Sequence, residues 1–247
     1  MRLNTDFEFL DAKLSKELPM TYSIVENNII KNATKEVATH ILTSYKDFDA
    51  MKEGFITLKI ARRFKFKTIK FKVFRDQNYD RIFILLEYDK ALKKLKSLDT
   101  KDCTFRQLYI YNQITNKKRF LEYLIFNFFI YNTNFDTIDL HYYPDTKEIG
   151  PLMDISIYDR PDKPTGYLFN VMIESIITPA LEYFTKEEIL PLIINISNRI
   201  LKMVSSKRML MFYEEQVLEE LIKYIKVQQK MAKRYFKWYL TQMIYTI

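Results

Sequence analysis

The chain has 247 residues, of which 48% are hydrophobic and 28% charged, so it can bury a substantial core as one large domain or two small ones. Its three glycines argue against nucleotide-binding loops that need closely spaced glycines, and its single cysteine excludes a disulfide framework or a multi-cysteine zinc site. Lys and Arg number 39 against 31 Asp and Glu, which gives a net charge of +8.

In chain order, the first predicted element is a helix over residues 32–45, where Val37, Ile41 and Leu42 recur at helical spacing. From residue 55 to residue 89, aromatic and β-branched residues alternate with charged ones, which predicts a hairpin of residues 64–75 and 81–88. The second strand of this hairpin is apolar on both faces, so we expect it to be covered on both sides.

Helices and a second hairpin are predicted to follow. Residues 90–98 form a short basic helix, and residues 104–131 form a longer one that breaks near Asn116. The second hairpin joins residues 137–143 to residues 149–158 through a turn that begins at Pro144.

The remaining elements are predicted to be helical. Residues 160–164 contain two prolines, which predicts a linker. Thr185 and Glu188 match a capping box at a helix start, and the final helix covers about residues 210–243. The sequence thus predicts an α+β protein, with a mixed part over residues 1–164 and a helical part over residues 165–247, packed together as one compact unit.

No apolar run in the sequence is long enough to span a membrane, and the amino terminus lacks the pattern of a signal peptide. We therefore expect no membrane span and a location inside the cell, in the cytoplasm, or in a virion.

Positive charge is sorted along the chain. Residues 59–75 carry eight Lys or Arg and residues 221–247 carry six, and neither segment contains an Asp or Glu. The rest of the chain is therefore net negative. Sorted charge of this kind indicates a polyanionic or acidic partner.

The first basic segment is predicted as a strand with a row of cations on one face and a β-bulge at Thr68. Alternate residues of a strand lie about 7 Å apart, comparable with successive phosphates of a nucleic acid. The row would also serve to keep an exposed edge strand soluble and unpaired. Its candidate binding residues are Arg62, Arg63, Lys65, Lys67, Lys70 and Lys72.

The second basic segment places five lysines on one stripe of the final helix, because they are spaced by three or four residues. The stripe is either the solvated face of a terminal helix or a surface for nucleic acid, an acidic protein or an anionic membrane. Trp238 is predicted as a core anchor in preference to a base-stacking platform. The lysines are Lys223, Lys226, Lys230, Lys233 and Lys237.

An acidic segment offers candidate metal ligands in Asp136, Asp139, His141 and Asp154. Carboxylates beside an imidazole could hold a divalent cation for phosphoryl chemistry, and the plainer interpretation is a polar hairpin that balances the basic segments.

Residues 132–154 include Asn132-Thr133-Asn134 and Met153-Asp154. This segment resembles the catalytic segment of HipA-like kinases, in which an Asn-x-Asp, a His and an Asn precede an apolar strand and a metal-binding Asp. The resemblance implies metal-dependent phosphotransfer. It also places Asn134 at the position of the catalytic Asp, and no phosphate-binding loop precedes the segment.

The leading interpretation is a non-enzymatic binding or assembly protein of an AT-rich virus, phage or mobile element, without a cofactor. Its basic surfaces would contact nucleic acid or an acidic partner subunit. One alternative is a metal-dependent or degenerate kinase-like phosphotransfer domain that uses the acidic segment. The other is a structural homo-oligomer subunit, in which the apolar face of the last helix packs against a copy of itself.

Overall fold

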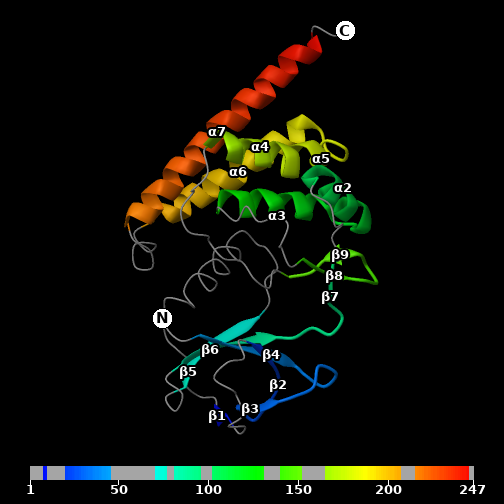
Figure 1. The fold of residues 1–247 in the computed structure, drawn as a ribbon, viewed down its shortest axis with the longest axis vertical. Coiled ribbons are helices and arrows are strands. Elements are labelled where there is room, and N and C mark those ends of the chain that lie inside the picture. The colour runs from blue at the N-terminus through cyan, green and yellow to red at the C-terminus, as the bar shows by residue number, and fades with distance from the viewer. Residues whose placement is uncertain are drawn as a thin grey trace. The chain divides into compact units, whose positions relative to one another are not determined.

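The computed structural model describes residues 8–9, 20–45, 70–76, 81–95, 102–130, 140–151, 165–206 and 215–244. These residues fall into two compact units: one ends at Lys93 and also takes in Gly150 and Pro151, and the other holds the rest. Strands make up most of the first unit and helices most of the second (Figure 1), which confirms the predicted α+β class. The division predicted at residue 164 stays a prediction, because residues 152–164 lie outside the described ranges.

Six strands of the described residues form the sheet of the first unit, in the order β1-β3-β2-β4-β6-β5. All neighbours are antiparallel except β1 and β3. The strands are β1 (Glu8–Phe9), β2 (Met20–Glu26), β3 (Ile29–Asn32), β4 (His40–Tyr45), β5 (Phe71–Asp76) and β6 (Arg81–Glu87).

The β2–β3 hairpin turns through two asparagines. Asn27 and Asn28 have φ of 50° and 66°, the left-handed conformation that a two-residue hairpin turn needs. Asparagine tolerates this conformation better than most residues. The sequence signal was therefore present at this turn, although no hairpin was predicted there.

The predicted helix over residues 32–45 is wrong, since its second half is strand β4. Ile41 and Leu42 are neighbours in sequence and are both buried, and Val37 is 56% exposed. β4 lies between β2 and β6 and pairs with both. Apolar residues on both faces of a covered strand produce a spacing that also fits one face of a helix, and pairing on both edges selects the strand.

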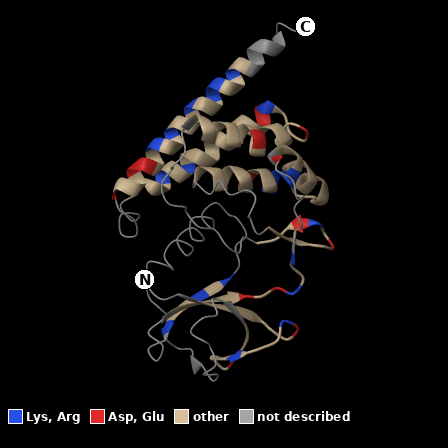
Figure 2. Cartoon of the chain, viewed as in Figure 1, with Lys and Arg blue, Asp and Glu red and all other residues tan. Residues whose placement is uncertain are grey.

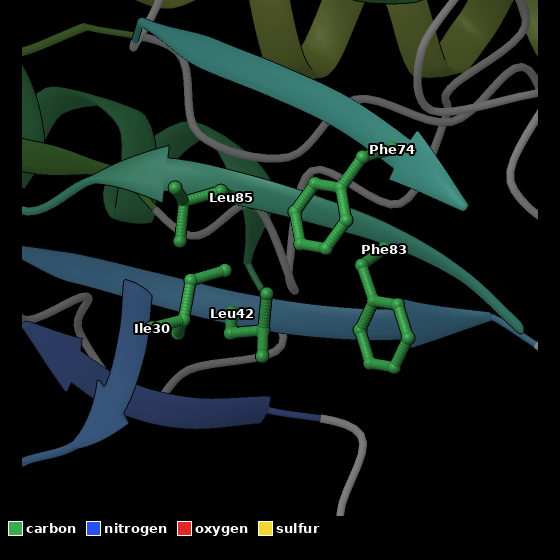
Figure 3. Packing of buried hydrophobic residues seen from close by; sticks show 5 residues of the cluster. All are labelled: Ile30, Leu42, Phe74, Phe83 and Leu85. Carbon is green, nitrogen blue, oxygen red and sulfur yellow. The ribbon is translucent and has the colours of Figure 1, made fainter. Parts of the chain in front are cut away.

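The hairpin of β5 and β6 confirms the first predicted hairpin within the described residues. Phe74 lies opposite Phe83, and their rings stack with centroids 5.5 Å apart. Ile82 to Leu85 are all buried, as expected for a strand covered on both sides. Figure 3 shows the two rings with Leu85, Leu42 and Ile30, which form one apolar cluster across neighbouring strands.

Three short strands form a second small sheet in the order β7-β8-β9 within the described residues. They are β7 (Lys93–Lys94), β8 (His141–Tyr143) and β9 (Glu148–Ile149), so the second predicted hairpin is confirmed where it is described. The predicted helix over residues 90–98 is wrong for its described part. The amide of Leu95 donates to the carbonyl of Leu140 at 2.7 Å, so this segment pairs with a strand.

The helices are α2 (Cys103–Gln113), α3 (Lys117–Phe129), α4 (Thr165–Met172), α5 (Thr178–Ala180), α6 (Lys186–Val204) and α7 (Glu215–Ile244), with a π-helix η1 (Ile173–Ile177) between α4 and α5. The predicted break at Asn116 is confirmed, and so is the capping box, in which the amide of Thr185 donates to Glu188 at 2.8 Å. Residues 120, 121 and 123–129 of α3 are buried, so α3 is enclosed on all sides.

The π-helix leaves one carbonyl that its own backbone does not satisfy. The amide of Thr178 donates to the carbonyl of Ile173, five residues back. By the same pattern the carbonyl of Glu174 would need the amide of Pro179, and proline has none. The hydroxyl of Thr104 on α2 donates to this carbonyl at 2.9 Å instead.

Tyr111 on α2 is fully buried among aromatic rings. Its ring centroid lies 4.8 Å from that of Phe120 and 5.0 Å from that of Tyr183. Burial raises the pKa of its hydroxyl, and Tyr183 raises it further. Its Oη atom has no hydrogen-bond partner in the described part of the chain. A buried hydroxyl without a partner costs free energy on folding.

We expect Tyr111→Phe to raise the free energy of unfolding by about 1 kcal/mol, because it removes a desolvated hydroxyl and no hydrogen bond. Urea denaturation measures the change. The matched control is Tyr224→Phe, which loses the bond from its hydroxyl to the carbonyl of Phe128 at 3.0 Å and should destabilise the protein. Equal destabilisation by both variants would show that the Tyr111 hydroxyl does have a partner.

Candidate anion-binding surface

α7 is held against the helical unit by one apolar face. Its buried side chains include Ile225, Ala232 and Phe236, none more than 1% exposed. Hydrogen bonds hold the same face: the side-chain amide of Gln229 donates to Ser197 Oγ at 2.6 Å and to Asn198 Oδ1 at 2.8 Å, both on α6. The ring of Tyr235 meets that of Phe169 on α4 at 6.1 Å. These contacts determine which side of α7 faces outward.

The predicted lysine stripe lies on the outward side. Its five members are all exposed, and Arg234 is exposed beside them. Figure 2 shows basic residues recurring along α7 beyond its acidic start. From residue 221 onward the sequence contains no Asp or Glu, so no carboxylate on this part of the helix offsets the charge. We name Lys223, Lys226, Lys230, Lys233 and Lys237 the lysine stripe.

Trp238 is 58% exposed, so its predicted role as a core anchor is wrong. It follows buried Phe236 by two residues, which on a helix places it on the opposite side from Phe236. It follows Arg234 by four residues, which places it next to that cation. The spacing from the buried positions was the sequence signal that would have identified Trp238 as a surface residue.

The basic strand is described only in part, since Arg62, Arg63, Lys65 and Lys67 lie outside the described residues. Lys70 and Lys72 are exposed, and among the described strands β5 stands at the end of the sheet order. Lys70 pairs with Glu87 at 3.3 Å, so a neighbouring carboxylate offsets its charge. The predicted bulge at Thr68 also lies outside the described residues. The strand as a phosphate-binding row therefore stays a prediction.

A titratable group lies beside these lysines. His40 starts β4 directly opposite Glu87, and its Nδ1 is 2.8 Å from Thr39 Oγ1. Partial burial lowers the pKa of the His40 imidazole, Glu87 opposes this shift, and Lys72 adds to it. His40 is thus half-buried at the start of β4.

Of the candidate metal ligands, only His141 lies within the described residues, where it begins β8 and is half-buried. Hydrogen bonds to the segment before α3 hold this hairpin: the backbone amide of Ile149 donates to Asn116 Oδ1 at 3.0 Å, and the hydroxyl of Thr115 donates to the carbonyl of Thr146 at 3.0 Å. The described residues contain no group of three or more His, Cys, Asp or Glu that could hold a metal ion. Asp136, Asp139 and Asp154 lie outside them, so the metal site stays a prediction.

No helix among the described residues is both long enough and apolar enough to cross a membrane.

Comparison with known proteins finds several similar solved structures and no family. A chain of the Shewanella oneidensis MR-1 complex of HipA, HipB and operator DNA is 12% identical, with a TM-score of 0.47 over 88% of this chain and 62% of that one. The Helicobacter pylori proinflammatory kinase CtkA is 14% identical, with a TM-score of 0.47 over 86% of this chain and 94% of that one. No family model and no curated protein sequence matches.

This chain therefore spans about 62% of the length of the Shewanella chain. A TM-score of 0.47 at such low identity assigns neither a family nor an activity to the chain.

We expect Lys72→Met to raise the pKa of His40, because it removes a nearby positive charge, and Glu87→Gln to lower it. NMR titration of the His40 ring measures both, with His141 as the second histidine signal. Since the pKa of His40 is lowered on folding, the stability of the folded protein should start to fall as pH drops below about 6.5, where the unfolded chain takes up the proton first. It should keep falling until pH passes the lowered folded pKa. A shift of the same sign in both variants would contradict this electrostatic assignment.

Proposed function

We propose that this chain binds nucleic acid through the lysine stripe of α7, without dependence on base sequence. The observation that supports the proposal is the exposure of all five lysines on a helix whose opposite face is buried against α6 and α4. A helix anchored in this way presents its cations as a fixed row.

The length of the stripe suits a phosphate backbone. Lys223 and Lys237 are fourteen residues apart, which corresponds to about 21 Å along a helix. One strand of a duplex presents about six phosphates over that distance, at about 3.4 Å each. Lysine is a flexible point charge that does not favour one planar partner, so the contacts would position the protein on phosphates and carry little sequence information.

The homo-oligomer interpretation is less well supported. It relied on a free apolar face of the last helix, and over its described side chains that face is buried within the chain. Assembly of copies would need another surface. An acidic protein partner would use the same lysines, and a protein that binds only such a partner would not bind oligonucleotides.

We expect Lys226→Gln/Lys230→Gln/Lys233→Gln to weaken binding to nucleic acid and to reduce the slope of log affinity against log salt by about 2 to 3. Each lost phosphate contact removes about 0.7 of slope for single strands and about 0.9 for duplexes. Fluorescence anisotropy with labelled oligonucleotides across about 50–200 mM salt measures this.

The matched control is Lys35→Gln/Lys118→Gln/Lys202→Gln, which removes the same charge from exposed lysines on other elements. It should leave the slope nearly unchanged. Equal losses in both triple variants, or no binding of the unchanged protein at low salt, would contradict the proposal.

A second candidate function is metal-dependent phosphotransfer by the acidic segment. The likeness of residues 132–154 to the catalytic segment of HipA-like kinases favours it, and the described hairpin fixes the histidine of that segment, His141, at the start of β8. CtkA is itself described as a kinase. In this function Asp139 and Asp154 would hold the divalent cation that neutralises the transferred phosphoryl group.

We expect the protein with Mg²⁺ or Mn²⁺ to transfer labelled γ-phosphate from ATP, and Asp154→Asn to reduce the rate by about 100-fold or more, because a lost metal ligand removes charge stabilisation from the transition state. Asp145→Asn is the control, since Asp145 is an exposed carboxylate in the turn before β9. An inactive protein with either metal, or equal rates for the two variants, would remove this candidate.

A further inference from the structure

The one tryptophan of the chain lies exposed beside a row of cations. Trp238 is 58% exposed on α7, and Arg234 lies one turn before it. Among the described side chains next to it in the sequence, Phe236 is 1% exposed, and Tyr235 is half-buried and packs on Phe169. These two rings are held within the chain, whereas Trp238 lies outside and borders the lysine stripe.

An exposed indole among cations matches the chemistry of an unpaired nucleotide. Every base has a π-face that stacks on an aromatic side chain, and the lysines and Arg234 attract the phosphates on either side of it. In a duplex the faces of the bases are stacked on one another, so Trp238 would find no base face to contact. A surface of this kind would contact single strands through the indole and duplexes through its cations alone.

A lipid surface fits these residues less well. An amphipathic helix binds a bilayer by burying its apolar face among the acyl chains. The described part of that face on α7 is already buried within the chain, at Leu218, Ile225 and Ala232.

We propose that α7 binds single-stranded nucleic acid in preference to duplex, with one base stacked on Trp238 and its flanking phosphates on the lysine stripe and Arg234. This inference rests on the proposed function, because the lysine stripe supplies the phosphate contacts. It adds the class of nucleic acid and the residue that selects it.

The experiment uses the tryptophan fluorescence of the full chain, excited at the red edge of the absorption band where tyrosine contributes little, and it reports on position 238 because no other tryptophan is present. The protein is titrated at low salt with a single-stranded oligonucleotide of about 12 residues and with a hairpin duplex of equal phosphate number. The single strand should quench the fluorescence and bind more tightly, and the duplex should leave the fluorescence nearly unchanged.

Variants separate stacking from charge. Trp238→Ala should weaken single-strand binding by about 5- to 150-fold and leave duplex binding nearly unchanged, and Trp238→Phe should restore most of the affinity. Anisotropy of labelled oligonucleotides measures these affinities. Phe105→Ala is the matched control, because Phe105 is an aromatic residue 63% exposed on α2, away from the stripe.

Two failures are distinguishable. Equal affinity for both oligonucleotides, without quenching and without an effect of Trp238→Ala, would overturn this inference and leave the proposed function in place. An absence of binding to either oligonucleotide would overturn both. Tighter binding to anionic lipid vesicles or to poly-glutamate than to the single strand, with a blue shift of the emission, would assign Trp238 to a different partner and also overturn the inference.

Discussion

The packing of α7 on α6 and α4 is the interaction on which the functional surface depends. A helix with cations on one side and apolar residues on the other has no preferred outward face until the apolar side is buried. Ile225, Ala232 and Phe236 provide that burial, and the bonds from Gln229 to α6 add directional contacts. The burial of the apolar side of α7 therefore places the charges of the lysine stripe on the surface. Glu215 in the first turn of α7 also suits the helix dipole.

The two basic segments of the sequence lie in different surroundings in the structure. On α7 the cations stand on a helix segment without a carboxylate, so their charges add. At β5 the described cations lie across from Glu87 and near the half-buried His40, so part of their charge is offset locally. Similar clusters of lysine in a sequence thus have different electrostatic consequences, because the neighbouring strand supplies a counter-charge in one case and the helix segment itself carries no carboxylate in the other.

Much of the fold was predictable from local signals. The break at Asn116, the capping box at Thr185 and the paired strands β5 and β6 all follow from residue patterns that act within a few positions. β4 was not predictable in this way, because Ile41 and Leu42 fit both a helix face and a doubly covered strand, and strands distant in sequence decide between them. The lysine stripe could be read from spacing alone. The exposure of Trp238 could not be assigned from its aromatic neighbours, because composition does not tell which ring faces inward, and only its spacing from buried Phe236 does.

The π-helix joins two positions that are far apart in the sequence. Pro179 leaves the carbonyl of Glu174 without a backbone donor, and the hydroxyl of Thr104 supplies one from α2. The bond therefore ties α2 to η1 at the position where the proline interrupts the backbone hydrogen bonds. A residue other than proline at position 179 would offer an amide to the same carbonyl, and the Thr104 hydroxyl would then share an acceptor that has two lone pairs.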